Sequence, residues 1–198
     1  MLRLVEIASN PFIFDSGYTR EPSKFQYLME IIYTATKQSE KCIVWSSFKR
    51  NVDWLYNNLD EFNPVRVHGN FGIEDRNRFL EKFKTDPTCQ VLVATPASLK
   101  EGFTLTTANH CIFFDRSFSL DDYLQAQDRI HRISQEKECH IYNLIAENTI
   151  DLWIDELLGA KELAARFGQG DINKDEYTDK ANFDYGLMIQ NILNINKD

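Results

Sequence analysis

Short apolar runs alternate with longer amphipathic segments through most of the chain. The apolar runs, which we predict as strands, lie at residues 42–45, 65–67, 90–94, 112–114 and 139–145. Segments with apolar residues at helical spacing precede the first run, at residues 24–37, and separate the next runs, at residues 51–59 and 73–83. Apolar strands joined through helices are typical of a parallel sheet that is covered on both faces. The pattern therefore predicts the α/β class, with a parallel sheet and helices on both faces.

The two ends of the chain depart from this alternation. Residues 1–9 form an amphipathic segment that Asn10-Pro11 interrupts, and Ser23 is predicted to cap the helix at 24–37. After the last strand, a helix is predicted from Thr149 to about Arg166, followed by the glycines at 168 and 170. We then expect a charged linker and a last helix at about residues 185–193.

Charge is distributed unevenly along the chain. The protein has 30 acidic and 22 basic side chains and a net charge of −8. Residues 1–145 carry 19 acidic and 17 basic side chains, whereas residues 146–198 carry 11 and 5. A net negative charge argues against a simple nucleic-acid binder, whose footprint is usually basic. Because the acidity is concentrated in the tail, a local basic stripe on the nearly neutral part is still compatible with the composition.

Cysteine and histidine spacing and the lack of long apolar runs indicate where in the cell the protein is expected. The four cysteines form no Cys-x-x-Cys pair, which favours reduced, buried thiols. The four histidines show no metal-ligand spacing, so we predict no metal site. No apolar run is long enough to cross a membrane, and the first residues lack a signal-peptide pattern. We expect an intracellular protein with no membrane partner, cytoplasmic in a prokaryote or virus and nuclear in a eukaryote.

The loops that follow the predicted strands carry the candidate chemistry. In an open parallel sheet, ligands bind at the carboxyl ends of the strands. Those loops contain hydroxyls, glycine and cations: Ser46–Arg50, His68–Asn70, Thr95–Ser98 and Asp115–Ser117. Such groups suit phosphate oxygens and read no bases. The alternative is that serines such as Ser47, Ser98 and Ser119 only cap helices.

A polar segment at residues 124–135 separates the last two predicted strands. If it is helical, Gln125, Arg129 and Arg132 share one face. Two guanidinium groups and an amide on one face suit a cluster of phosphate oxygens. The alternative is a solvated helix face on which the arginines pair with Asp121, Asp122 and Asp128.

This segment carries a recognisable motif. Gln125-x-x-Asp128-Arg129-x-x-Arg132, followed by Ile133-Ser134-Gln135, resembles the last signature motif of superfamily-two helicases, in the form found in Swi/Snf-type DNA translocases. Weaker matches to earlier motifs occur in the same order at Lys41–Phe48, His68-Gly69 with Arg76 and Phe83, and Val93–Thr95 through Gly102–Thr106. Departures at Ser134, at Ser98-Leu99, at one inserted residue before Gly102 and at Thr104 indicate a divergent branch.

The resemblance implies a RecA-like C-terminal lobe at residues 23–148. Residues 1–22 would link it to the preceding lobe, and residues 149–198 would form a helical brace and an acidic tail. Arg129 and Arg132 would reach the γ-phosphate of ATP, and Gln125 would position water or bond to the nucleotide or a neighbouring motif. Gly102 and Thr104 would also contact the nucleotide. The residues implied to hold the phosphate backbone of double-stranded DNA are Ser46, Ser47, Lys49, His68, Gly69, Arg76 and Thr95. Glu101 is either a switch between the two sites or a surface residue.

The sequence contains no Gly-x-x-x-x-Gly-Lys-Ser/Thr phosphate loop. The resemblance therefore implies that ATP and Mg²⁺ are held mainly by an N-terminal RecA-like lobe that this chain lacks, and that the chain alone is inactive. Because the phosphate loop is absent from the sequence, we do not assign Asp115 as a magnesium ligand. The tail would dock on either lobe or on a protein partner. The alternative function is a non-catalytic RecA-like module that binds a protein.

Overall fold

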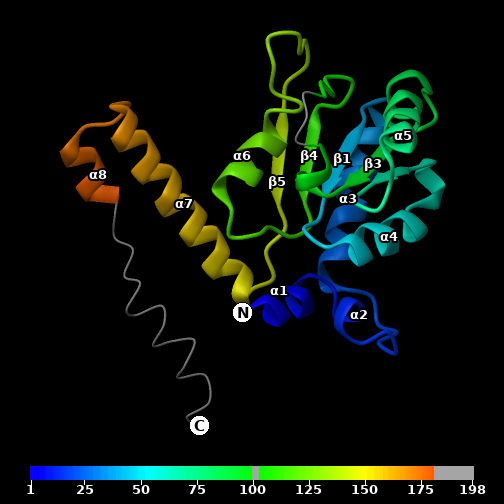
Figure 1. Ribbon diagram of the computed structural model, residues 1–198, viewed down its shortest axis with the longest axis horizontal. Helices are drawn as coiled ribbons and strands as arrows, with labels where there is room; N and C mark the ends of the chain where they lie inside the picture. Colours follow the sequence, from blue (N-terminus) through cyan, green and yellow to red (C-terminus); the bar gives the residue numbers. More distant parts are fainter. Residues whose placement is uncertain (100–102, 181–198) are drawn as a thin grey trace.

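A five-stranded parallel sheet forms the centre of the molecule (Figure 1). The computed structural model describes residues 1–99 and 103–180. In chain order the strands are β1 (Cys42–Trp45), β2 (Val65–Val67), β3 (Val91–Ala94), β4 (His110–Phe113) and β5 (His140–Asn143), and the spatial order is β2-β3-β1-β4-β5. All four pairings are parallel. The predicted α/β class with a parallel sheet is confirmed.

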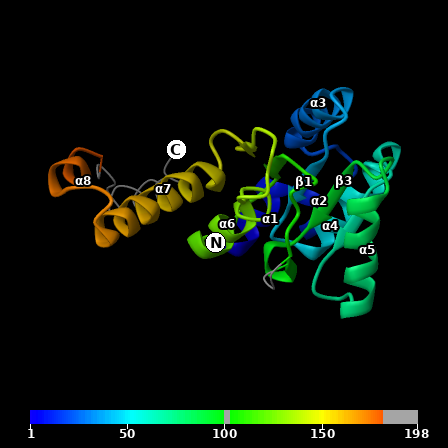
Figure 2. The same ribbon diagram turned by 90° about the horizontal axis from the view of Figure 1, so that it is seen from above.

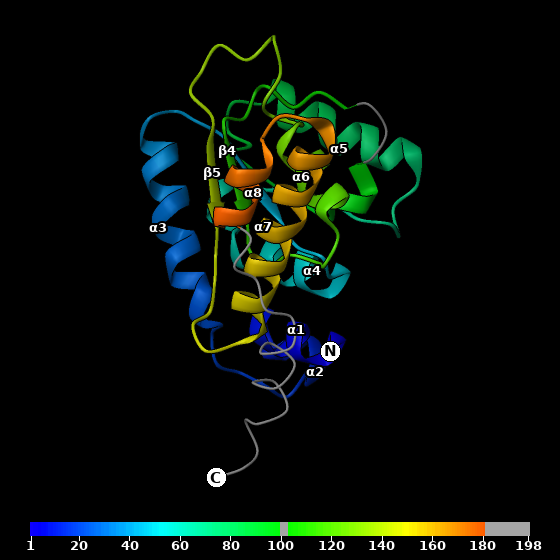
Figure 3. The same ribbon diagram turned by 90° about the vertical axis from the view of Figure 1, so that its left-hand side faces the viewer.

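Helices cover both faces of this sheet, because alternate strand residues point to opposite sides. The helices are α1 (Leu2–Ser9), α2 (Pro11–Phe14), α3 (Ser23–Lys37), α4 (Lys49–Asn58), α5 (Ile73–Thr85), α6 (Leu120–Gln127), α7 (Ile150–Gln169) and α8 (Lys174–Lys180), with single 3-10 turns at Asp60–Phe62 and Pro96–Leu99. Cys42 and Val44 pack under α3 and α4, whereas Ile43 and Trp45 pack under α5 and α6. Figure 3 shows α3 on one side of the sheet and α6 on the other.

The cysteines lie within or beside these cores and are free thiols. Cys42, Cys89 and Cys111 are buried, and Cys139 is partly exposed. Burial raises the pKa of the Cys42 and Cys111 thiols to about 12. Within residues 1–99 and 103–180, no helix is long and apolar enough to span a membrane.

Helix α6 ends earlier than the sequence pattern predicts. Its last residue is Gln127 and Asp128 is its C-cap, so Arg129 and Arg132 lie beyond the helix. The prediction that both arginines share a helix face with Gln125 is wrong. One tertiary and one local hydrogen bond take the place of helical bonds: the Arg129 carbonyl accepts from the Leu105 amide (3.0 Å), and the Ile130 carbonyl accepts from the Gln135 side chain (3.2 Å). These bonds fix the segment after Gln127 in an irregular path.

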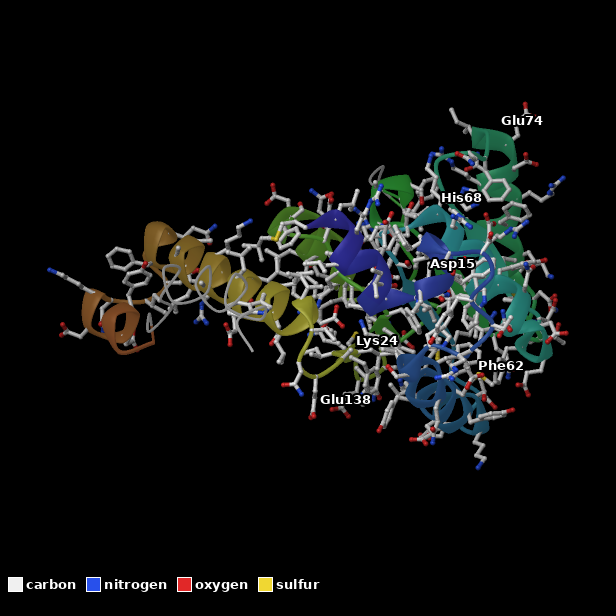
Figure 4. The ribbon with its side chains drawn as sticks, turned by 90° about the horizontal axis from the view of Figure 1, so that it is seen from below. Asp15, Lys24, Phe62, His68, Glu74 and Glu138 are labelled. Atoms are coloured by element: carbon white, nitrogen blue, oxygen red, sulfur yellow. The ribbon has the colours of Figure 1, made fainter. Side chains whose placement is uncertain are left out.

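Helix α3 begins differently from its predicted cap. Pro22 occupies the N-cap position, and Ser23 is the first helical residue without a capping bond from its side chain. The start of α3 is instead fixed by Lys24, whose Nζ donates to the Phe114 carbonyl (3.1 Å) and forms a buried ion pair with Asp151. Figure 4 shows Lys24 close to the base of α7.

Helix α7 packs only its first half on the domain. Ile150, Ile154 and Leu158 form a core with Val5 of α1, and Trp153 packs against it. Thr149 caps the helix and Gly170 ends it with a left-handed φ of 80°. The remaining turns extend away from the sheet and carry α8 (Figures 1 and 2).

Helix α8 lies where the sequence pattern predicts a linker. Asn173 and Glu176 form a reciprocal capping box, in which each side chain accepts from the backbone amide of the other (3.0 and 2.9 Å). Tyr177 stacks on Phe167 of α7 with ring centroids 4.8 Å apart. The helix predicted at residues 185–193 lies outside the described residues.

Candidate nucleotide and nucleic-acid interface

The loops that follow β1, β2, β3 and β4 meet at one edge of the sheet, because all the strands are parallel. The register pairs Trp45 with Phe113 and with Ala94, so the residues directly after these positions are neighbours. The sequence-based prediction of one shared edge therefore holds for all four loops. What each side chain does there differs.

Asp115 holds the loop after β1 through hydrogen bonds to Ser46 and Ser47. The Ser46 side chain is buried, and its hydroxyl donates to Asp115 Oδ2 (2.6 Å). The Ser47 amide donates to Asp115 Oδ1 (2.7 Å), so neither of these two donors faces solvent. Ser47 does not cap α4, whose N-cap is Phe48. Lys49, the first residue of α4, is exposed.

The loop after β2 positions that lysine. Lys49 Nζ donates to Asn70 Oδ1 (2.8 Å), and a Cβ at Gly69 would lie 3.3 Å from both Cε and Nζ of Lys49. Gly69 therefore lets the lysine cross the loop closely. His68 is buried, and its Nδ1 accepts from the Asn70 amide (3.4 Å). This places the imidazole proton on Nε2, which lies 3.1 Å from Asp53 Oδ1.

Arg76 of α5 braces the loops after β2 and β3. Its Nε donates to the Phe71 carbonyl (2.9 Å) and its Nη1 to the Ser98 carbonyl (3.4 Å). Thr95 is buried at the end of β3, and its carbonyl accepts from the Ser98 hydroxyl (2.7 Å). Of the three serines with a capping alternative, Ser119 is an N-cap and accepts from the Asp122 amide (3.2 Å).

The two arginines of the last motif have different surroundings. Arg129 is buried, and its Nη1 donates to the Phe103 carbonyl (3.4 Å). Burial and then the charge of Arg132 lower the pKa of the Arg129 guanidinium, with Asp128 opposing them. Arg132 is exposed and is held by the Asp128 carbonyl (3.1 Å) and the Thr104 hydroxyl (2.9 Å). The structure thus brings together both arginines and Thr104.

The other residues predicted to contact the nucleotide are Gln125 and Gly102. Gln125 is exposed on α6 and is not on a common helix face with the arginines. Gly102 and Glu101 lie outside the described residues.

Sequence reasoning did not predict which residues support this edge by hydrogen bonds. Asp115, Asn51, Asn70 and Asp53 each hold another candidate side chain or loop. Asp115 and Asn70 had a sequence signal, since both lie in loops that follow predicted strands and therefore at the ligand-binding edge. For Asn51 and Asp53, which lie inside α4, the sequence offers no signal of this kind.

Comparisons with known proteins identify the family of the chain. The model of the family "Helicase conserved C-terminal domain" matches residues 23–134. The human lymphoid-specific helicase is 30% identical over 159 residues, covering 79% of this chain and 19% of that protein. The ATP-dependent helicase fft1 of Schizosaccharomyces pombe is 31% identical over 156 residues, covering 77% of this chain and 16% of that protein.

A solved structure shows the same fold. The Sulfolobus solfataricus SWI2/SNF2 ATPase core in complex with dsDNA matches with a TM-score of 0.68 and 29% identity, over 80% of this chain and 34% of that one. The chain thus spans less than a fifth of the two curated relatives. It belongs to the helicase conserved C-terminal domain family, as a C-terminal RecA-like lobe of the SWI2/SNF2 type.

Proposed function

We propose that this chain is the C-terminal motor lobe of an ATP-dependent DNA translocase of the Swi/Snf type. The observation that carries the proposal is the family match over residues 23–134, which contains the whole candidate edge and both arginines. Residues 1–22 would be the link to an N-terminal RecA-like lobe, residues 23–148 the lobe itself, and residues 149–198 its brace and tail. ATP and Mg²⁺ would be held mainly by the N-terminal lobe.

The arginine site would complete the nucleotide site of that partner lobe. Arg132 would be the principal finger, and its exposure and its bonds to Thr104 and the Asp128 carbonyl support this role. Arg129 would contribute a second positive charge from its buried position. Gln125 and Gly102 complete the proposed set. A guanidinium that reaches the γ-phosphate stabilises the charge that develops during phosphoryl transfer.

The sheet edge would hold DNA through its phosphates. Lys49 offers an exposed ammonium, and Ser47, Arg76 and Thr95 flank it at the same edge. The buried Ser46 and His68, with Gly69, would shape the loops that present these groups. The relative whose structure was solved with dsDNA supports duplex DNA as the ligand. Contacts of this kind fix a protein on DNA without reading the sequence.

The experiment is a salt titration of duplex binding by this chain. Binding through phosphates must weaken steeply with salt, and Lys49→Ala should lower the slope of log K against log salt by about 1 for every DNA sequence alike. Lys37→Ala is the matched control, because Lys37 is exposed at the end of α3, beside the opposite edge of the sheet. Binding that ignores salt would contradict the proposal.

A second candidate function is a non-catalytic module that binds a protein. The concentration of negative charge in residues 146–198, with 11 acidic and 5 basic side chains, favours it. It predicts that neither duplex binding nor its salt dependence changes in the Lys49→Ala variant. The two intact arginines favour the motor, since a module without catalysis has no use for them.

A further inference from the structure

A buried polar network lies beneath the proposed DNA-facing loop. Its five members are Ser9 (1% exposed), Asn10 (0%), Ser46 (0%), Asn51 (0%) and Asp115 (3%). They come from three separate parts of the chain: the end of α1 and the residue after it, the segment from the β1–α4 loop into the first turn of α4, and the loop after β4. None of the proposed nucleotide or DNA contacts requires a network at this place.

Asp115 is the centre of the network. Its Oδ2 accepts from the Ser9 hydroxyl (2.6 Å), the Ser46 hydroxyl (2.6 Å) and Asn51 Nδ2 (3.2 Å), while its Oδ1 accepts from the Ser47 amide (2.7 Å). All of these donors are neutral. Since hydrogen bonds to an ionised acceptor are strong and directional, they hold the carboxylate and its donors in one arrangement.

Asn51 closes the network on the N-terminal side. Its Nδ2 donates to the Ser9 hydroxyl (3.1 Å), and its Oδ1 accepts from Asn10 Nδ2 (3.0 Å). Asn10 Oδ1 in turn caps α2 by accepting from the Phe12 amide (3.1 Å). The junction of α1 and α2 is therefore bonded to the same carboxylate as the loop that leads to Lys49.

We propose that Asp115 is a positioning residue that couples the N-terminal segment to the Ser46–Lys49 loop. A displacement of Ser9 and Asn10 changes the donors around Asp115 and so loosens the bond that holds the Ser47 amide. This consequence for DNA rests on the proposed function, because residues 1–22 are there the link to the other lobe. The bonded connection itself does not depend on that function.

The test removes the Ser9 hydroxyl, which donates to Asp115 and accepts from Asn51. Ser9→Ala leaves the Ser46 and Ser47 bonds to Asp115 in place, and Ser16→Ala, at an exposed position of the next loop, is the matched control. Amide hydrogen exchange at Ser47 should accelerate about tenfold in Ser9→Ala, the effect of losing one hydrogen bond to a charged group, and stay at the wild-type rate in Ser16→Ala. An unchanged rate in Ser9→Ala overturns the coupling.

Duplex binding supplies the second readout. Ser9→Ala should weaken binding roughly three- to tenfold with an unchanged salt slope, because Lys49 is still present but its loop is less ordered; Lys49→Ala changes the slope itself. Salt-dependent binding that is equally tight in wild type and Ser9→Ala overturns the consequence for DNA. If the wild-type chain shows no salt-dependent binding, the proposed function fails, and the Ser47 exchange rate still decides the coupling.

Discussion

At the residue scale, several candidate side chains serve to hold the protein's own loops. His68 bonds to Asp53, Ser46 to Asp115, and Arg76 to two loop carbonyls. The side chains left exposed to a ligand include Lys49, Gln125 and Arg132. A motif identifies both kinds of residue together, and only their burial separates them.

The difference between the two arginines gives the first prediction at this scale. In a protein that joins this lobe to an N-terminal lobe of the proposed kind, Arg132→Ala should lower kcat for ATP hydrolysis roughly a thousandfold, as expected for loss of an arginine finger. Its thermal midpoint should stay near wild type, because Arg132 is exposed. Arg129→Ala should lower both kcat and the midpoint, because Arg129 is buried and holds Phe103.

The control for this pair is Arg132→Lys, which keeps the charge but loses the planar fork. It should recover little of the lost kcat. A full recovery would mean that Arg132 acts only as a positive charge, and unchanged turnover in Arg132→Ala would remove it from the catalytic site. Steady-state phosphate release at saturating DNA is the measurement.

A second residue-scale feature is the pair of Glu40 and His110 at the opposite edge of the sheet. His110 is buried, its Nε2 lies 2.6 Å from Glu40 Oε2, and its ring stacks on His140 at 4.8 Å. The hydrogen bond from His110 lowers the pKa of the Glu40 carboxyl, while burial opposes it and Asn109 and Lys137 add to the lowering.

This direction fixes the sign of a pH effect. A carboxyl whose pKa is lowered by folding stabilises the protein above its unfolded pKa, and this stability is lost as pH falls through the folded pKa. Glu40→Gln should therefore cost about 1 kcal/mol at pH 7, and the difference from wild type should shrink between about pH 5 and pH 3. Urea midpoints across that range measure it, with the exposed Glu30→Gln as control for one lost charge. A difference that is constant with pH would contradict the assignment.

At the element scale, contacts far apart in the sequence decide where helices begin and end. The positions of β1, β3 and β4 followed from apolar runs, because burial on both faces leaves a continuous apolar signal. The end of α6 did not, since it depends on bonds from Leu105 and Gln135, which lie outside the helix. The capping box at Asn173 and Glu176 was readable in the sequence and was overlooked within a charged stretch.

The junction of α3 and α7 gives the prediction at this scale. Lys24→Met leaves the buried carboxylate of Asp151 without its cation, although the Ala146 amide still donates to it (2.9 Å). Removing one partner of a buried pair costs about 3–5 kcal/mol, so the urea midpoint should fall strongly. Lys37→Met, at an exposed position of the same helix, should change the free energy of unfolding by less than about 0.5 kcal/mol. Equal midpoints for both variants would contradict this account.

At the scale of the whole molecule, the α/β class and the shared ligand edge were predictable, because periodicity fixes the strands and parallel strands share an edge. The hydrogen-bond network around Asp115 was not predictable, since its members lie as far as 106 residues from Asp115 in the sequence. Nothing in a linear pattern links Ser9 to that carboxylate. Polar networks of this kind follow from the fold and cannot be predicted before it.

The prediction at this scale concerns catalysis by the chain alone. Because the sequence has no phosphate loop, the pure 198-residue chain should release no phosphate from Mg²⁺-ATP, with or without duplex DNA. Phosphate release is measured against an identical preparation of Arg132→Ala, which controls for a contaminating ATPase. Turnover present in wild type and lost in that variant would show that the chain completes a nucleotide site by itself.

Helix α7 is fixed at one end by the apolar contacts up to Leu158 and by Lys161, whose Nζ donates to the Phe118 carbonyl (2.6 Å), and its last turns extend away from the sheet. Its 20 residues correspond to a rod of about 30 Å, rooted where Lys24, Asp151 and α1 meet. A small tilt at the base of a helix of that length displaces its far end considerably: a tilt of about 10° moves the end by about 5 Å. The base of α7 also touches the N-terminal helix through Val5, so a small rotation there is turned into a large movement of α8.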